Sequence, residues 1–141
     1  MDEKKKKKKS KGITSKAKKK TAVARAVIRK GTGMVHINRM NIETIKPKYL
    51  YEFVKEPLEL ADSLAGEVDI SVSVAGGGFM GQAVSARSAI AKALVKFHPN
   101  EKLKQKFLKY DRMLLVDDPR RVEPKKPLGT KARKKKQKSK R

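Results

Sequence analysis

The stretch from Val68 to Phe97 constrains the fold most, because its hydrophobic period changes once within 30 residues. Alternation of β-branched and polar residues predicts a half-buried strand at 68–75. From Gly81 to Phe97, apolar residues recur every three or four positions, which predicts an amphipathic helix. Its other side is expected to carry a polar, basic stripe formed by Ser85, Ser88, Lys92 and Lys96.

Glycines join the predicted strand to the predicted helix. Gly76, Gly77 and Gly78 are consecutive, and Gly81 follows three residues later. The spacing Gly-x-Gly-x-x-Gly is typical of turns whose backbone N–H groups bind a phosphate at a helix N-terminus. A nucleotide cofactor is disfavoured, because little alternating strand and helix sequence follows. A nucleic-acid phosphate and a purely structural turn both remain open.

Charge divides the chain into three parts. The 141 residues include 38 Lys and Arg against 14 Asp and Glu, a net charge of +24. Residues 1–20 hold 11 of these cations and residues 119–141 hold 12. Together these two segments contain only three acidic residues. We therefore expect a globular domain at 21–118, a disordered Lys-rich arm at 1–20, and an extended basic tail at 119–141.

This distribution implies a polyanionic partner. Neither arm has an aromatic residue or a myristoylation start, so nucleic acid is favoured over a membrane surface. The Lys-rich arm, which includes Lys4–Lys9, has three open interpretations: a solvated tail, a localisation signal or an RNA-binding extension. The basic tail is interpreted either as an RNA-binding or as a solubilising segment.

Several classes of function are disfavoured. The chain has no cysteine, which excludes disulfides, thiol catalysis and cysteine-ligated metals. No apolar run approaches the roughly 20 residues of a membrane helix, and no secretory signal is present. His36 and His98 have no carboxylate at metal-ligand or triad spacing. We expect an intracellular protein without catalytic residues, metal, cofactor or small-molecule substrate.

The remaining elements are expected as strands at 21–30, 33–38 and 113–116 and helices near 47–60 and 100–109. The first two strands are expected to form a hairpin around Gly31-Thr32-Gly33. One face of the first strand is small and apolar. The other projects Arg25 and Arg29, for which simple solvation and contact with an RNA backbone both remain open.

Four stretches in order resemble a known family. They are Thr21–Arg25 (TAVAR), Gly76–Arg87 (GGGFMGQAVSAR) leading into Ile90–Leu94 (IAKAL), Asp118–Lys126 (DPRRVEPKK) and Gln137–Arg141 (QKSKR). Together they resemble the ninth small-subunit ribosomal protein (universal S nine) in its archaeal and eukaryotic form. The resemblance extends from Thr21 to the last residue, and the six-lysine run lies outside the family's pattern.

The resemblance implies an α+β fold, with a mixed four-stranded sheet and helices packed on one face, related to the second domain of ribosomal protein S five. It also implies a non-enzymatic structural role in the cytoplasm, in the small ribosomal subunit. The expected partners are 16S-type rRNA in the subunit head, neighbouring head proteins, and the anticodon stem-loop of P-site tRNA, which the tail would reach.

Carried onto this sequence, the resemblance assigns tRNA contact to Ser139, Lys140 and Arg141. The planar guanidinium of Arg141 suits phosphate chelation. The residues expected to contact rRNA are Arg25, Arg29, Gly76, Gly77, Gly78, Gly81, Arg87, Arg120, Arg121, Lys125, Lys126, Lys131, Arg133 and Lys134. Two alternatives are a nucleotide-dependent enzyme that uses Gly76–Gly81 as a phosphate loop, and a general nucleic-acid packaging protein.

Overall fold

A computed structural model of the chain describes residues 12–136 and residue 139. Its centre is a mixed five-stranded sheet in the order β1-β2-β5-β3-β4. Neighbouring strands are antiparallel except β3 and β5, which are parallel. The strands are β1 (Ile13–Lys19), β2 (Ala22–Lys30), β3 (Val35–Ile37), β4 (Met40–Asn41) and β5 (Val68–Ala75).

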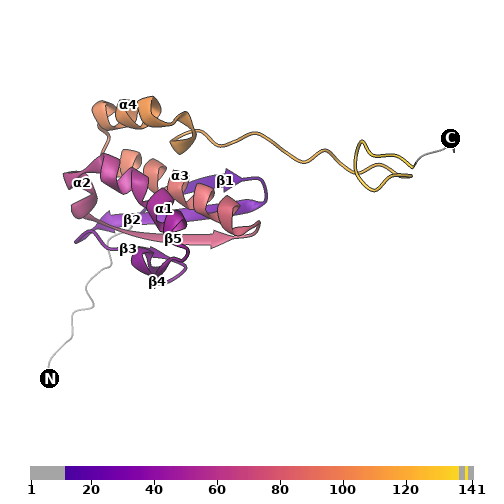
Figure 1. The fold of residues 1–141 in the computed structure, drawn as a ribbon. Coiled ribbons are helices and arrows are strands. Elements are labelled where there is room, and N and C mark those ends of the chain that lie inside the picture. Colours follow the sequence, from indigo (N-terminus) through magenta and orange to yellow (C-terminus); the bar gives the residue numbers. More distant parts are fainter. Residues whose placement is uncertain (1–11, 137–138, 140–141) are drawn as a thin grey trace, which may run out of the picture.

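Helices cover one face of this sheet. α3 (Phe79–Phe97) lies against β1, β2 and β5, α1 (Lys48–Ala61) packs beside α3, and α4 (Glu101–Tyr110) lies on the far side of α3 (Figure 1). The short elements are η1 (Ile42–Thr44), α2 (Ser63–Gly66) and η2 (Arg112–Leu114). This arrangement confirms the predicted α+β class and the predicted packing on one face, with one strand more than expected.

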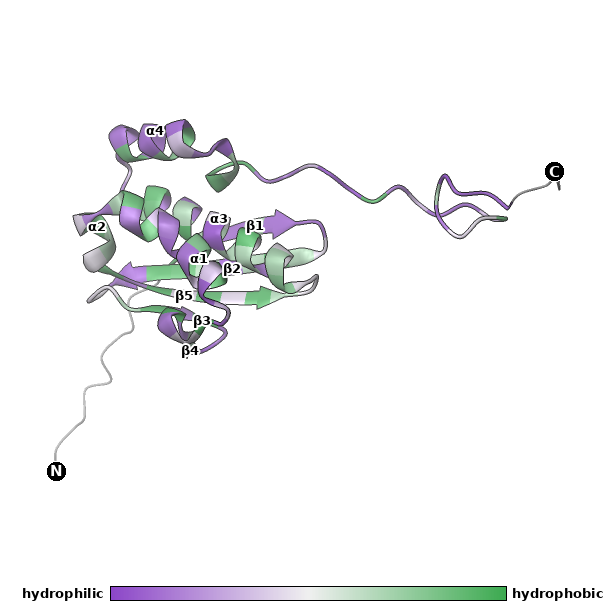
Figure 2. Ribbon diagram, in the orientation of Figure 1, coloured by the Kyte–Doolittle hydropathy of each residue, from purple (hydrophilic) through white to green (hydrophobic). Residues whose placement is uncertain are grey.

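The core lies between the sheet and its two helices. Alternate residues of β2 and β5 are buried, so the predicted strand at 68–75 is confirmed with its apolar side inward. Ala24 and Ala26 on β2 face Ala89 and Ala93 on α3, all fully buried, and these short side chains let the helix approach the sheet closely. Figure 2 shows apolar residues along β5 and α3.

The side of α3 that was predicted to be a polar, basic stripe is covered. Ser85 and Ser88 are buried, and the Ser88 hydroxyl donates to the Met113 carbonyl oxygen at 2.9 Å. η2 packs onto α3 and covers Ser88, whereas the Ser85 hydroxyl donates to the Gln82 carbonyl oxygen within α3 at 2.9 Å. The prediction of an exposed stripe is therefore wrong for its first half.

Lys92 and Lys96, the other half of that stripe, reach the edge of β1. The Lys92 ammonium donates to the carbonyl oxygen of Lys16 at 3.4 Å, and the Lys96 ammonium donates to that of Thr14 at 3.2 Å. The Lys18 backbone N–H donates to Asp117 Oδ1 at 3.3 Å. Side chains thus occupy backbone groups of alternate β1 residues, which point away from β2 in an antiparallel ladder.

The strand β1 was predicted as part of a disordered arm. Ser15 and Ala17 are buried beneath α3, and the Ser15 hydroxyl donates to the Ala89 carbonyl oxygen at 2.7 Å. Lys16 and Lys18 alternate with them on the opposite face. The folded part of the chain therefore begins before residue 21, while residues 1–11 lie outside the described part.

Two further expectations are corrected. β2 and β3 do not pair as a hairpin, because β5 lies between them. The loop that joins them is held by β5 instead: Asp69 Oδ1 accepts the backbone N–H groups of Thr32 and Met34. The strand expected at 113–116 is absent from the described structure. There, Asp111 accepts the Met113 N–H and begins η2, which buries Leu114.

Candidate nucleic-acid interface

Three segments meet at one end of the sheet: the β1–β2 turn, the glycine loop (Gly76–Gly78) between β5 and α3, and the chain that follows η2. The glycine loop packs directly on the turn. Gly76 and Gly77 have φ angles of +76° and +66°, and a Cβ on Gly76 would lie 2.6 Å from the Thr21 carbonyl oxygen. Glycine is therefore required at position 76 both for its backbone angle and for this close approach.

The start of α3 is exposed. Gly78 is its N-cap and provides no side-chain hydrogen bond, and a Cβ on Gly78 would meet no atom within 4 Å. Gln82 Nε2 donates to the Gly76 carbonyl oxygen at 3.1 Å, which steadies the loop without covering the first N–H groups of the helix. A 19-residue helix presents the positive end of its dipole here, near the β1–β2 turn, in which Lys20 is exposed.

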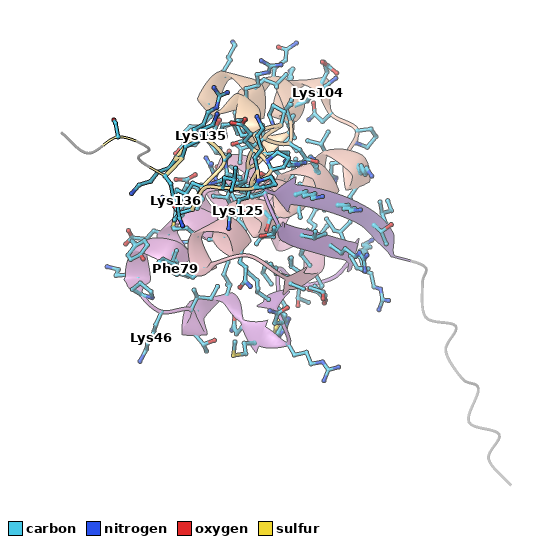
Figure 3. All side chains as sticks on the ribbon, turned by 90° about the vertical axis from the view of Figure 1, so that its right-hand side faces the viewer. Lys46, Phe79, Lys104, Lys125, Lys135 and Lys136 are labelled. Carbon is cyan, nitrogen blue, oxygen red and sulfur yellow. The ribbon has the colours of Figure 1, made fainter. Side chains whose placement is uncertain are left out.

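Gly81 belongs to the helix itself. A Cβ on Gly81 would lie 3.5 Å from the Ala22 Cβ, which is ordinary van der Waals contact. Next to the loop, Phe79 is 64% exposed. Figure 3 looks onto this end of the molecule and shows Phe79 at its surface. The loop thus combines a packed half, Gly76–Gly77, with an exposed half that begins at Gly78.

A buried carboxylate holds the beginning of the basic tail. Asp118 is only 5% exposed, and its side chain contacts the Lys19 ammonium and the Arg120 guanidinium. Arg120 Nη2 lies 2.6 Å from Asp118 Oδ2, and the Arg120 backbone N–H donates to Asp118 Oδ1 at 3.0 Å. The Arg120 guanidinium, with the Lys19 ammonium, holds the pKa of Asp118 well below its usual value. We call Asp117 and Asp118 the carboxylate anchor.

Asp117 completes the carboxylate anchor. Its Oδ1 lies 2.6 Å from the Lys92 ammonium on α3 and also accepts the Lys18 backbone N–H. Arg121 Nη1 donates to the carbonyl oxygens of Asp118 and Arg120. The anchor therefore ties the tail to β1 and α3, and Figure 1 shows the tail running out from η2 past β1.

The tail beyond the anchor has no helix or strand in its described residues, and Figure 2 shows its polar character. Gly129 and Lys135 form an isolated antiparallel bridge, so the chain turns back on itself there. Glu123 Oε2 accepts from Arg133 Nε at 2.8 Å. Five of the predicted rRNA contacts are exposed along this segment: Lys125, Lys126, Lys131, Arg133 and Lys134. Figure 3 shows Lys125, Lys135 and Lys136 projecting from it.

Arg87 is not part of this exposed surface. It is 6% exposed, with Nη2 at 2.6 Å from Glu56 Oε2 and Nη1 at 2.8 Å from Asp111 Oδ2. Its guanidinium also lies over the Phe53 ring, 4.4 Å from the centroid. The structure places Arg87 in the interior, where it joins α1 and α3 to the end of α4. This corrects the prediction that Arg87 faces rRNA phosphates.

Arg25 and Arg29 lie at a different place, on the sheet face that the helices leave uncovered, and both are exposed. Ser139 is exposed as well, whereas Lys140 and Arg141 lie outside the described residues. The predicted site residues therefore divide among the glycine-loop end, the tail, the open sheet face and, for Arg87, the interior.

Little in the described residues supports the enzyme alternative. No three His, Asp or Glu side chains of this part are placed to hold a metal ion. Nor does any helix within it have the length and apolar character needed to cross a membrane. The strand before the glycine loop, β5, pairs antiparallel with β2 and parallel with only three residues of β3. A dinucleotide-binding turn opens a long parallel sheet instead.

Comparison with known proteins decides among the remaining alternatives. The family model described as "Ribosomal protein S9/S16" matches residues 17–141. The chain belongs to the ribosomal protein S9/S16 family. Membership confirms the resemblance found in the sequence, and it makes the protein a structural component of the ribosome rather than an enzyme.

Two relatives show how far the similarity extends. The protein named "Small ribosomal subunit protein uS9" from Pyrobaculum aerophilum is 48% identical over 127 residues, which cover 90% of this chain and 89% of the relative. The protein of the same name from Methanococcus maripaludis is 44% identical over 110 residues, covering 78% and 82%. The S9/S16 similarity thus includes both the globular domain and the basic tail.

The carboxylate anchor was missed by the sequence interpretation. Its signal was present: Asp117 and Asp118 are adjacent acidic residues immediately before the most basic stretch of the second half of the chain. Acidic residues in such a place indicate a specific cationic partner. The partners Lys19 and Lys92, however, are 99 and 25 residues away from their carboxylates.

Proposed function

We propose that this protein is a component of the small ribosomal subunit, working in the cytoplasm, that binds 16S-type rRNA in the subunit head and reaches P-site tRNA with its tail. One observation carries the proposal: the glycine loop, the β1–β2 turn with its exposed Lys20, and the anchored tail converge at one end of the domain. This end offers backbone N–H groups and cations together, as phosphate recognition requires.

The tail is long enough to reach tRNA beyond the globular domain. Some twenty residues in extended form span on the order of 60–70 Å at about 3.3 Å each. Residues 119–141 carry 12 Lys and Arg against one Glu, so they gain contacts with phosphates along their whole length. In this proposal the globular domain docks first, and the tail follows a path through rRNA until Ser139, Lys140 and Arg141 meet the anticodon stem-loop.

The first test is sedimentation of the tagged full chain from a native lysate on sucrose gradients. We expect stoichiometric co-migration with small subunits and with complete ribosomes, retained in moderate salt. A chain that stays at the top of the gradient would contradict the assignment to the subunit.

The second test concerns the tail end. Subunits assembled with a chain that lacks Ser139–Arg141 are expected to assemble normally but to release P-site tRNA faster. The matched control is the double variant Lys135→Gln and Lys136→Gln, which removes the same number of side-chain cations but keeps the terminal residues. Equal tRNA release from both variants would show that total charge, and not the terminal sequence, is responsible.

A further inference from the structure

The sheet has one face without a covering element in the described structure. Helices α1 and α3 pack on the side that bears Ala24, Ala26 and Val72. On the other side, the strand register aligns side chains into rows. Lys16, Arg25 and Ser73 form one row across β1, β2 and β5, and Thr14, Val27, Ser71 and His36 form the next across four strands. We call this side the open face.

The cations of the open face have no carboxylate partners. Residues 12–42, which supply β1 to β4, contain eight Lys and Arg and no Asp or Glu. Within residues 12–136, no ion pair involves the five cations of this face, which are Lys16, Lys18, Arg25, Arg29 and Arg39. By contrast, Lys19, Lys92, Arg87 and Arg120 are each paired. The five cations of the open face therefore remain available to an external anion.

One acidic residue of the open face, Asp69, lies directly opposite Arg29 in the register of β2 and β5. Its Oδ1 accepts the backbone N–H groups of Thr32 and Met34, at 2.8 and 3.1 Å. These N–H groups lower the pKa of Asp69, so it remains ionised and serves the loop before β3. The carboxylate thus has a local structural role, and it leaves the nearby Arg29 without an ion pair.

The surface is hollowed along its centre. Two adjoining shallow hollows share Val27, His36 and Ser71 as lining residues. The first is also lined by Arg25, Arg39 and Ser73, and the second by Arg29 and Thr32. Guanidinium, hydroxyl and imidazole groups lie in this lining beside the apolar side chains of Val27, Met34 and Val72, and no Phe, Tyr or Trp contributes to it. Such a surface suits a hydrophilic anionic chain better than an apolar partner.

Arg25 and Arg29 are four residues apart on one strand, and so about 13 Å apart along β2 at about 3.3 Å per residue. Lys16 extends the cationic row towards β1, and Arg39 extends it beyond β3. A polymer with regularly repeated negative charges can contact all of these groups at once, whereas a single bound anion cannot. In a ribosomal protein, the polymer of that kind is rRNA.

We propose that the open face is a second RNA-binding surface, separate from the glycine-loop end, which binds the sugar–phosphate backbone of an rRNA segment. Arg25, Arg29 and Arg39 contact phosphates, and Ser71, Ser73 and His36 offer hydrogen bonds to backbone oxygens. Recognition is of the backbone and not of base sequence. This inference rests on the proposed ribosomal function and adds to it: the domain joins two rRNA segments, one at its end and one across its sheet.

The absence of cysteine makes a local test possible. A single cysteine introduced by Ser73→Cys on the open face would carry a tethered iron chelate that generates hydroxyl radicals. The matched control is Glu59→Cys on α1, which is also exposed but lies on the helical side. Each full-length variant would be assembled into small subunits, and strand breaks in the rRNA would be mapped.

We expect a compact group of backbone breaks from position 73 and markedly weaker breaks from position 59. If subunits incorporate the Ser73→Cys protein normally but the rRNA remains uncut near it, the inference is overturned while the ribosomal assignment stands. Cross-linking from position 73 to a neighbouring protein would overturn it too, because the occupant would then be a polypeptide. Failure of both variants to enter subunits would instead contradict the proposed function.

The energetic test uses the salt dependence of binding of the full chain to full-length small-subunit rRNA transcribed in vitro. In the double variant Arg25→Gln and Arg29→Gln, the slope of log K against log salt concentration should fall by about 2, or about 1 for each phosphate contact. The control, Lys48→Gln with Lys55→Gln, removes equal charge from residues already paired on α1. An equal fall in the control would contradict the open face as a specific surface.

Discussion

Arg87 and Arg25 lie on regular elements of the same basic chain, yet they belong to opposite regions of the molecule. Arg87 is enclosed by α1, α3 and the end of α4, with two carboxylates and an aromatic ring around its guanidinium. Arg25 stands on the open face, among Lys16, Ser73 and Arg39. The interior region contains acidic partners for its cation, and the open region does not.

The difference teaches that net charge alone does not identify an RNA contact. The segment 43–69, which includes α1 and α2, has seven acidic and three basic residues, whereas segment 12–42 has eight basic and none acidic. Glu56 and Asp62 of the first segment pair with Arg87 and Lys106, so those cations are neutralised within the fold. In the second segment Lys19 pairs with Asp118, whereas the five cations of the open face are available to a partner. The following substitutions test this division.

The largest effect is expected from Arg87→Met. This change leaves Glu56 and Asp111 without their shared cation at a buried site, and removing one partner of a buried ion pair typically costs about 3–5 kcal/mol. Urea denaturation of the full chain would measure the free energy of unfolding. Arg25→Met is the control and should change it by no more than about 0.5 kcal/mol. Similar losses in both variants would abolish the distinction between the two regions.

Within the glycine loop, Gly76 is packed against the fold and Gly78 faces open space. Gly76→Ala places a Cβ against the Thr21 carbonyl oxygen at a positive φ, so the stability should fall by about 1–3 kcal/mol. Gly78→Ala meets open space at a φ of −99° and should cost less, at most about 1 kcal/mol for a poorer N-cap. Thermal unfolding of the two variants compares them directly. Equal losses would mean that packing on the β1–β2 turn is unimportant.

Asp118→Asn tests the carboxylate anchor. The folded state lowers the pKa of Asp118, so its stabilising contribution is present above the unfolded-state pKa of about 3.9 and is lost as the pH falls below it. We therefore expect a lower urea midpoint for the variant at pH 7 and a shrinking difference from the native chain at acidic pH. Asp62→Asn, at an exposed pair with Lys106, is the control and should show almost no difference at either pH.

The smallest effect is expected from Lys48→Gln on α1. The Lys48 ammonium lies 3.5 Å from Glu52 Oε1, and both side chains are largely exposed. Exposed pairs of this spacing contribute at most about 0.5 kcal/mol. Neither the unfolding free energy nor the affinity for rRNA should change measurably. A clear loss of rRNA binding would show that the helical side also takes part in recognition.

Local patterns were sufficient to predict much of the fold. Alternation gave β2 and β5 with the correct inward face, and the period of three to four residues located α3 to within two residues of its start. The strand β1 was missed because its alternation of Lys16 and Lys18 with Ser15 and Ala17 was hidden within a lysine-rich stretch. The predicted pairing of β2 with β3 was also wrong, since the residues of β3 pair with residues of β5 that lie 35 positions further along the chain.

The candidate site was predicted unevenly for the same reason. The glycine loop is recognisable from its own residues, because backbone angles and helix starts are local properties. The burial of Arg87 depends on Glu56 and Asp111, which folding brings from 31 and 24 residues away. The anchor depends on the still more remote Lys19, which is 99 residues from Asp118. Sequence patterns therefore predicted the cations but not which of them the fold itself neutralises.

The side chains along β1 have a consequence for the protein before it meets RNA. An unpaired sheet edge is a template onto which another chain can add a strand, and many copies of a ribosomal protein must stay apart until assembly. Lys92, Lys96 and Asp117 occupy backbone groups of alternate β1 residues and place charges beside them. The same lysines that would suggest nucleic-acid binding thus occupy the backbone groups through which a second strand would have to pair.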